Sequence, residues 1–513
     1  MNRRDKQLYS WLAWLSFISL IFYFTLRVYI YYIRSIGFIN SLFGVLLLIA
    51  EAHSILQSLG FISSIIRLGR PNVNVYRRVK LDPKKLPGVA VLVPARNEPL
   101  KVLEATFICL VSLNYKNKKL FFLDGSDEEF IVENDKLAKK YGLIHYVPEK
   151  PSKNKAEIIN KILPELDTKY FCIFDADQNP MPEFLMETVS LAEYSGNIAF
   201  VQTPQLYTNI GVSPIAKGSA LQQSIFFENI CEGKGTSNAM FCCGTNFLMR
   251  TDVLKKVGGF DENSVTEDFA TSVEIHALGY RSIYYKHVRA FGMAPETLSA
   301  YLKQQYRWSG GTVGVIRKLV SLIYNGKLNL RPIQIWEYFL SATYYFTGWS
   351  FFILVMCPAL YLLFNIPSYF SNPFFYLATF VPYYILTLAT FYATMKGRNY
   401  SIRDVFMGTI MGSISFPILM QSTLAAIMNK KMIFQITNKG KGGIVPFWRL
   451  WPWMFVLIVN FFAIINGFLR YSENHYAIGI NIFWCIYHFI LISTIFKLNR
   501  EPNFQEKNIL NYT

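Results

Sequence analysis

The chain has 513 residues, which is too long for one compact domain and enough for two or three. Hydrophobic residues make up 52% and charged residues 17%, a balance that excludes a disordered or collagen-like chain and disfavours a wholly soluble one. The net charge of +17 does not by itself distinguish nucleic acid, anionic lipid and phosphorylated substrates as partners. The seven cysteines are scattered and include no C-x-x-C pair, which disfavours a zinc site or a disulfide framework.

The acidic residues divide the chain into regions. Residues 1–80 hold two of the 34 acidic residues, residues 81–334 hold 27, and the last 179 residues hold five. An acid-bearing middle between apolar, acid-poor ends indicates one soluble domain between two membrane blocks. We therefore expect an N-terminal membrane region, a soluble domain, a C-terminal membrane region and a short tail, over residues 1–80, 81–325, 326–500 and 501–513.

Six stretches are long and apolar enough to cross a bilayer, which takes about 20 residues of helix. They are residues 11–33, 39–63, 339–363, 374–395, 451–470 and 477–496. The first lacks a small-residue cleavage site, so we expect an uncleaved anchor rather than a signal peptide. Arg27, Glu51 and His53 interrupt the first two stretches, and we expect them to face the bundle interior and tie helices together.

Lysine and arginine in the connecting segments predict the orientation. The N-terminus, residues 67–80, residues 396–450 and the tail are basic, whereas the connections on the opposite side carry little charge. This pattern predicts that both termini and the middle domain are cytoplasmic. A further apolar stretch, 404–428, is long enough to span, but spanning would place the basic segment 430–449 outside, so we expect an interfacial helix.

The middle domain alternates expected strands with expected helices. The strands are 89–94, 120–123, 144–147 and 169–174, and the helices are 100–112, 127–141 and one that opens near Lys153 and Lys155. This alternation predicts an α/β domain with a mainly parallel sheet. Ligands of such sheets bind beyond the carboxyl ends of the strands, and Asp124, Asp175 and Asp177 all follow strand ends.

Asp175 and Asp177 form an Asp-x-Asp pair directly after a strand. Two such carboxylates can hold a hard divalent cation, Mg²⁺ being the usual choice, that bridges a diphosphate. Taken alone the pair is a weak motif, and an ordinary solvated loop is the alternative. Asp124 alone is weaker still, because aspartate often caps the helix that follows a strand.

Three further motifs follow along the chain. A segment ending in Cys243-Gly244-Thr245-Asn246 precedes an expected helix that stops at Gly258, and Thr266-Glu267-Asp268 comes next. Gln304, Arg307 and Trp308 lie at i, i+3 and i+4 of an expected helix and therefore share one face. An isolated Arg-Trp pair beside a membrane would be read as an interfacial anchor.

Taken in order, these motifs resemble those of the processive, membrane-embedded family 2 glycosyltransferases, and most of all the cellulose-synthase-like group. That group carries a D, D-x-D, T/E-E-D and Q-x-x-R-W series. The matching residues are Asp124, Asp175 with Asp177, Thr266-Glu267-Asp268, and Gln304 with Arg307-Trp308. Gly125 departs from the series where the family often has a second aspartate, and Asp127 is the residue that could substitute for it.

The segment from Phe434 to Gly440 resembles the F-x-V-T-x-K-G gating loop of this group. The resemblance makes Phe434, Thr437 and Lys439 gating-loop residues within 430–445. A basic, glycine-containing loop at this place could equally be a lipid-facing connector.

The resemblance implies a GT-A-type α/β domain inserted in a transmembrane bundle of about six spans plus interfacial helices. It implies a processive, inverting enzyme that polymerises sugar from a nucleotide-diphosphate donor, with UDP-glucose favoured, into a β-linked polysaccharide extruded through its own channel. The implied partners are the donor, the growing polysaccharide and the bilayer, with Mg²⁺ or Mn²⁺ as cofactor and no nucleic acid. Two alternatives stay open: a non-processive transferase that loads a lipid carrier, and a transporter.

The resemblance also implies a role for each matched residue. Asp268 would be the general base, and Gln304, Trp308, Thr266 and Glu267 would contact the acceptor. Donor binding would fall to Asp124, Lys155, Asp175, Asp177 and Arg307, of which Asp175 and Asp177 would also hold the metal.

Overall fold

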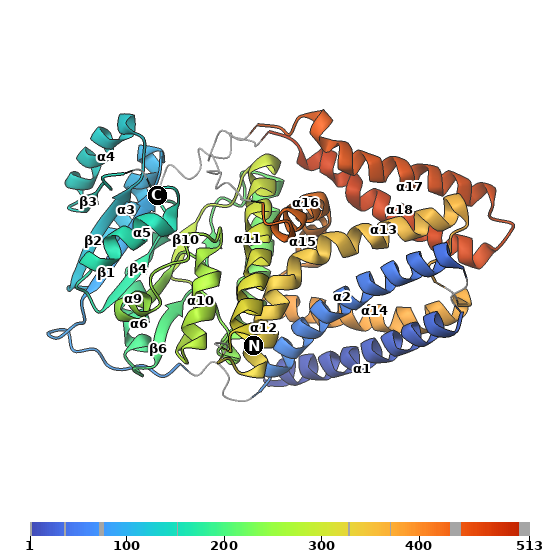
Figure 1. The fold of residues 1–513 in the computed structure, drawn as a ribbon, viewed down its shortest axis with the longest axis horizontal. Coiled ribbons are helices and arrows are strands. Elements are labelled where there is room, and N and C mark those ends of the chain that lie inside the picture. The colour runs from blue at the N-terminus through green and yellow to red at the C-terminus, as the bar shows by residue number, and fades with distance from the viewer. Residues whose placement is uncertain are drawn as a thin grey trace.

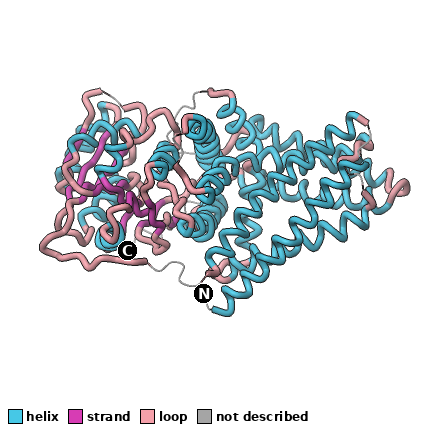
Figure 2. Tube along the Cα trace, turned by 60° about the horizontal axis from the view of Figure 1, so that its bottom comes forward, coloured by secondary structure: helices cyan, strands magenta, loops and turns pink. Residues whose placement is uncertain are grey.

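A computed structural model describes residues 3–34, 37–70, 76–150, 152–326, 329–369, 371–430 and 443–501. A mixed α/β domain lies at one end of the molecule and a bundle of long helices at the other, as Figure 1 and Figure 2 show. The chain enters through two long helices, forms the α/β domain, and returns to the bundle. The predicted gating residues Phe434, Thr437 and Lys439 and residues 502–513 lie outside the described residues.

The α/β domain is built on a seven-stranded sheet with the order β3-β2-β1-β4-β8-β6-β9. Neighbouring strands are parallel except where β8 pairs with β4 and β6, which confirms a mainly parallel sheet. The strands are β1 (Val89–Ala95), β2 (Lys118–Asp124), β3 (Ile144–Tyr146), β4 (Tyr170–Ile173), β6 (Ile198–Gln202), β8 (Phe247–Arg250) and β9 (Arg281–Tyr284).

The expectation of one helix between Asn246 and Gly258 was wrong in its first half. Phe247–Arg250 form the antiparallel strand β8, and only Thr251–Lys256 form a helix, α9. Four apolar or long side chains in a row fit a buried strand as well as a helix, so periodicity alone does not separate the two. Pairing with β4 and β6 buries β8 in the sheet.

Helices cover both faces of the sheet, as a parallel sheet requires. One apolar cluster includes Phe107, Phe122 and Phe184, and another includes Ile159 and Phe200. The covering helices include α3 (Leu100–Val111), α4 (Glu128–Lys140), α5 (Lys155–Ile162), α6 (Phe184–Ala192) and α10 (Glu267–Ala277).

A smaller sheet and several helices connect this domain to the bundle. The small sheet has the order β5-β10-β7, with strands Asn179–Pro180, Ala290–Gly292 and Leu206–Tyr207. The connecting helices are α7 (Pro214–Ile225), the π-helical segment Phe226–Cys231, α8 (Glu232–Thr236) and α11 (Leu298–Tyr324). In Figure 1, α11 stands between the sheet and the bundle.

Six helical segments among the described residues are long and apolar enough to cross a membrane. They agree with the six predicted stretches and comprise Gln7–Ile33 of α1 (Arg3–Arg34), α2 (Phe38–Leu68), Pro332–Phe364, α14 (Pro373–Lys396), Phe447–Leu469 and α18 (His475–Leu498). The third includes α12 (Pro332–Thr343) and α13 (Thr347–Phe364), and the fifth includes α17 (Trp451–Leu469).

The polar residues of the first two helices lie inside the bundle, as predicted. Arg27 is 1% exposed, and its Nε donates to Glu51 Oε2 at 2.8 Å. The Tyr23 hydroxyl donates to the other Glu51 oxygen at 2.8 Å. His53 Nε2 lies 3.0 Å from the carbonyl oxygen of Thr343, so these groups do tie helices together.

The expected single helix over 404–428 is two helices. α15 (Ile402–Ile414) and α16 (Phe416–Ile427) meet at Ser415 with a bend of 48°. Pro417 explains the break, because its ring clashes with the carbonyl four residues earlier and it has no N–H to donate. Figure 1 shows the pair close to end-on beside α11, while the long helices run across the view. Their placement at the membrane interface stays a prediction.

A buried ionic cluster joins the bundle to the α/β domain, and its loss should destabilise the protein. Lys234 of α8 pairs with Glu337 of α12 at 3.0 Å, both side chains being 3% exposed or less, and Arg67 of α2 pairs with the same carboxylate. Glu337→Ala would leave two cations unpaired, which costs about 3–5 kcal/mol. We expect a clearly lower melting temperature in detergent, whereas Asp167→Ala, at the exposed pair with Lys119, should change it little. An unchanged melting temperature for Glu337→Ala would contradict the structural role.

Candidate active site

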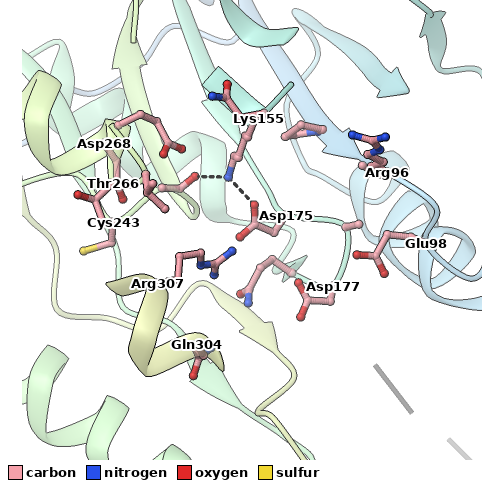
Figure 3. A pocket seen from close by; sticks show the side chains of 18 of the residues that line it. Arg96, Glu98, Lys155, Asp175, Asp177, Cys243, Thr266, Asp268, Gln304 and Arg307 are labelled. Carbon is pink, nitrogen blue, oxygen red and sulfur yellow. Dashed lines mark hydrogen bonds and ion pairs between the residues drawn. The ribbon is translucent and has the colours of Figure 1, made fainter. Parts of the chain in front are cut away.

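A cavity of about 720 Å³ opens at the carboxyl ends of β1 and β4, the place where parallel sheets bind ligands. It is closed on its other side by the start of α10 and the first half of α11 (Figure 3). The predicted residues that line it are Lys155, Asp175, Asp177, Thr266, Glu267, Asp268, Gln304, Arg307 and Trp308. Predicted residues from four separate segments of the chain therefore meet in one cavity.

Lys155, the first residue of α5, lies at the centre of this cavity. Its Nζ pairs with Asp175 and donates to the carbonyl oxygen of Gly244 at 2.7 Å. Burial lowers the pKa of Lys155, but the carboxylates of Asp175, Glu267 and Asp268 outweigh burial and raise it. The amine is therefore held as a cation beside the Asp-x-Asp pair.

The backbone at Gly244 allows two cavity side chains to come close. Its φ is +77°, a conformation that favours glycine. A Cβ at this position would stand 3.0 Å from Asp268 Oδ2 and 4.0 Å from Lys155 Nζ. Glycine is thus required both by the turn and by the approach of Asp268 and Lys155.

Asp268 is the second residue of α10 and is half-buried. Its Oδ1 accepts a hydrogen bond from the backbone N–H of Phe269 at 2.7 Å. Burial, followed by the neighbouring carboxylate of Glu267, raises the pKa of Asp268 to about 7, against the opposing effects of the Phe269 N–H and Lys155. A carboxylate with this pKa can take up a proton near neutral pH.

The first half of α11 presents a row of polar and aromatic side chains to the cavity. Gln304, Arg307 and Trp308 share this face, as their spacing predicted. Among the described residues, Gln304 Oε1 and Thr266 Oγ1 are buried and have no hydrogen-bond partner. Since buried polar atoms are normally paired, these two are candidates to bind ligand hydroxyl groups.

Asp124 is the last residue of β2 and so stands at the predicted strand end, but it is not among the residues that line the cavity. Its side chain is 0% exposed, and its oxygens accept from Ser126 N at 3.0 Å, Asn134 Nδ2 at 2.9 Å and His145 Nε2 at 3.1 Å. Burial raises the pKa of Asp124, but these hydrogen bonds outweigh it and lower the pKa below its usual value. The structure therefore places the carboxylate beneath the cavity wall, next to the lining residue Gly125.

Asp175 and Asp177 fit a metal site in which the protein supplies some of the ligands and a bound substrate supplies the others. No group of three His, Cys, Asp or Glu residues able to hold a metal occurs in the part of the chain that the structure describes. Mg²⁺ and similar cations are commonly bound through one or two carboxylates together with substrate phosphates. The donor set is thus suited to a cation that arrives with a phosphorylated ligand.

Several lining residues were not predicted. Lys303 precedes Arg307 by four residues on α11, so helical spacing could have found it. Tyr207 reaches the cavity from the short strand β7, which carries no pattern readable from sequence.

A second cavity, of about 1050 Å³, adjoins the first and shares Val265, Lys303 and Arg307 with it. It extends between α11, α13, α16 and α17. Aromatic side chains are prominent in its wall, and they are Tyr306, Phe352, Phe416, Trp448, Trp451, Trp453 and Phe455. The face of α11 that carries Arg307 therefore borders both cavities.

Comparison with known proteins finds similarity to glycosyltransferases. Residues 170–394 match the family model described as glycosyl transferase family group 2. The UDP-forming cellulose synthase catalytic subunit of Pseudomonas fluorescens is 25% identical over 90% of this chain and 63% of its own length. Cellulose synthase 1 of Komagataeibacter xylinus is 24% identical over 92% of this chain and 30% of its own length. The chain thus spans less than two thirds of these relatives.

Among solved structures, a mannosyltransferase from Pyrobaculum calidifontis in complex with GDP-mannose and Mn²⁺ superposes with a TM-score of 0.54. It is 16% identical, and the match covers 76% of this chain and 99% of the other. This likeness supports the GT-A type of fold. With its six candidate membrane helices and its cellulose-synthase relatives, the protein is a multi-pass membrane protein. In sequence the chain is similar to the cellulose-synthase catalytic subunits, and residues 170–394 are similar to the family 2 group of glycosyltransferases.

Proposed function

We propose that this chain is a processive, inverting glycosyltransferase that builds a β-linked polysaccharide from a nucleotide-diphosphate sugar, with UDP-glucose as the donor. The observation that carries the proposal is that a cation suited to phosphate, a candidate general base and a candidate stacking residue meet in one cavity: Lys155, Asp268 and Trp308 all line it. The UDP-forming cellulose synthases among its relatives support the choice of donor.

The donor diphosphate would lie between Lys155 and Arg307. Both are cavity-lining cations, and the guanidinium of Arg307 points toward the Lys155–Asp175 pair in Figure 3. Arginine can bind phosphate oxygens in a bidentate manner, whereas lysine acts as a point charge. The nucleoside would extend along the end of β1, on the side where Asp124 supports the wall.

Asp175 and Asp177 would hold Mg²⁺ or Mn²⁺. A cation bound there with the donor supplies positive charge that offsets the negative charge developing on the diphosphate. The related fold that binds GDP-mannose together with Mn²⁺ supports a divalent ion in the family's donor site.

Transfer would proceed in one displacement. The oxygen of an acceptor hydroxyl attacks the anomeric carbon of the donor sugar, the bond from that carbon to the diphosphate oxygen breaks, and the hydroxyl proton passes to Asp268. Asp268 lies at the start of α10, and its pKa of about 7 suits proton uptake at neutral pH. One displacement without a covalent intermediate inverts the anomeric centre, from an α-linked donor to a β-linked product.

The acceptor end of the polymer would lie on α11. Trp308 would stack on the terminal sugar, and Gln304 and Thr266, each with an unpaired buried oxygen, would bind its hydroxyl groups. Glu267 lines the same side of the cavity. These contacts orient the acceptor rather than take part in the chemistry.

Two further cavities would give the product a route into the membrane bundle. The aromatic second cavity lies between the active site and helices α13 and α17. A third cavity, of about 570 Å³ and lined by residues of α1, α2, α13, α14 and α18, includes Tyr23, Tyr376, Tyr384 and Trp484. Aromatic rings stack well on the apolar faces of sugars, so both cavities suit a polysaccharide that leaves through the bundle.

The gating role of Phe434, Thr437 and Lys439 is retained as part of the proposal. In sequence they lie between α16 and α17, and residues of both helices line the second cavity. We also place the catalytic domain and both termini in the cytoplasm, because the basic connections all fall on that side.

Trp308→Ala should impair use of the acceptor more than binding of the donor. Loss of the stacking surface is expected to cost roughly 1–3 kcal/mol of acceptor binding, and thus to shorten the product while the donor KM changes little. Gel filtration of radiolabelled product checks the length, and Trp11→Ala, at an exposed helix position remote from the cavity, serves as the control. A product of normal length with a raised donor KM would refute the acceptor assignment.

The function itself is tested by incubating the purified enzyme with a panel of nucleotide sugars and measuring both nucleotide release and product size. Radiolabel in a high-mass polymer that a β-specific glycosidase degrades supports the proposal. A lipid carrying one sugar would instead establish a non-processive transferase. Absence of nucleotide release with every donor would refute transferase activity.

A further inference from the structure

His145 lies beside the active site in β3 and has no part in the transfer described above. Its Nε2 is 3.1 Å from Asp124 Oδ2, and its Nδ1 is 3.1 Å from Asp135 Oδ1. The ring is 8% exposed and stacks on Phe122, with ring centroids 5.2 Å apart and planes 8° from parallel. A histidine between two carboxylates from different elements is therefore fixed in place.

The geometry requires a charged imidazole. An ionised carboxylate only accepts hydrogen bonds, so both ring nitrogens must donate, which only the imidazolium can do. Burial lowers the pKa of His145, but Asp124 of β2 and Asp135 of α4 outweigh burial and raise it above the usual value. Lys139, which pairs with the other oxygen of Asp135 at 2.6 Å, is the further charged group on this side.

From Asp124 a chain of hydrogen bonds leads to the cavity wall. Asp124 Oδ1 accepts from Ser126 N at 3.0 Å, and Ser126 Oγ accepts from Asn97 N at 2.9 Å. Asn97 Oδ1 accepts from Asp127 N at 2.9 Å, and Asn97 Nδ2 donates to Asp127 Oδ2 at 2.7 Å. Asn97 and Gly125 both line the cavity.

The wall that these bonds hold includes a turn at Asn97. Its φ of +53° lies in the left-handed region, which asparagine adopts more readily than other non-glycine residues. The wall faces the end of β1, where the proposed nucleoside lies. Loss of the support behind the wall should therefore weaken nucleotide binding without touching the groups that carry out transfer.

We propose that His145 is a positioning residue for the donor: held between Asp124 and Asp135, it fixes the turn from Gly125 to Asp127 and Asn97 as the wall on which the nucleoside of a nucleoside diphosphate rests. This inference rests on the proposed function, because it takes the cavity to be the donor site. It gives Asp124 an indirect role, through the turn, in place of a direct contact with the nucleoside.

The test compares wild-type enzyme with His145→Gln, Asp135→Asn and the control His287→Gln, which changes an exposed histidine. Binding of UDP in the presence of Mg²⁺ is measured by calorimetry between about pH 6 and pH 9, together with donor KM and kcat. Asp135 is 33% exposed, so its neutral variant is a milder change should His145→Gln fold poorly.

We expect His145→Gln to weaken UDP binding and raise the donor KM roughly tenfold, with kcat little changed, because a charged hydrogen bond is lost. The wild-type enzyme should bind UDP tightly at low pH and lose affinity as the pH rises through the raised pKa of His145. The pH dependence should disappear in His145→Gln and shift to lower pH in Asp135→Asn. A purely structural role would not predict this shift.

The outcomes separate the inference from the function on which it rests. Wild-type UDP affinity and pH dependence in both His145→Gln and Asp135→Asn would overturn the inference, even if polymer is made. Altered affinity and pH dependence without any sugar transfer would support the inference and refute the proposed function. Failure of the wild-type enzyme to bind UDP or to transfer sugar would refute both.

Discussion

Replacing Asp268 by asparagine should abolish sugar transfer while leaving nucleotide binding nearly intact. The change removes the proton acceptor but preserves size and the oxygen that accepts from the Phe269 N–H. A positioned general base contributes about 10²–10⁴-fold to a rate, so kcat should fall by at least that factor. UDP binding by calorimetry and polymer synthesis from radiolabelled donor measure the two effects separately.

The raised pKa of Asp268 also predicts how the activity depends on pH. Asp268 must be ionised to accept a proton, and its pKa of about 7 lies well above that of an ordinary aspartate. The value of kcat/KM for wild-type enzyme should therefore rise with pH through neutrality and level off above it. Glu267→Gln is the informative companion variant: removal of the neighbouring carboxylate should shift this rise to lower pH. Polymer synthesis by Asp268→Asn at the wild-type rate would eliminate Asp268 as the base.

Asp177→Asn should have the second-largest effect, through the donor and its cation. Asp175 and Asp177 are the two carboxylates proposed to bind the cation. Loss of one negative charge should therefore weaken binding of the cation and, with it, binding of the diphosphate. We expect transfer to fall by roughly 10²–10³-fold and the Mg²⁺ or Mn²⁺ concentration for half-maximal activity to rise.

A titration of activity against each metal, before and after treatment with a chelator, provides the measurement. Asp167→Asn, at an exposed carboxylate outside the cavity, is the matched control and should respond to metal like wild-type enzyme. If Asp177→Asn kept the activity and metal response of the control, the metal assignment would be wrong.

Much of the fold could be predicted because each element carries a local pattern. The strands that end at Ala95, Asp124 and Ile173 are short apolar runs followed by polar turns, and the membrane helices are set by length and hydropathy. β8 was missed because a four-residue apolar strand has no period of its own and is defined by its partners. The bend at Ser415 was missed although Pro417 marks it, since proline also occurs inside α13 and α14 without ending them.

The sequence predicted most of the residues that line the candidate site, but it did not predict how all of their side chains are placed. Spacing on one helix placed Gln304, Arg307 and Trp308 together, and motif order placed Asp175 and Asp268 in the same domain. That Asp124 turns away from the cavity could not be read from the sequence. It depends on His145 and Asn134, which only the folded sheet brings to the same carboxylate.

The face of α11 that borders two cavities has a consequence for how a polymer would advance. The helix is held against α16 by a hydrogen bond between Ser309 and Ser422 and by Arg317, which donates to the carbonyl oxygen of Ala426. Arg307, the proposed donor contact, and Gln304 and Trp308, the proposed acceptor contacts, all lie on α11. A movement of α11 with the product would therefore also move Arg307 away from the donor. If the proposed polymer synthesis is right, the polymer would slide past α11 by one sugar after each transfer, while α11 keeps its position.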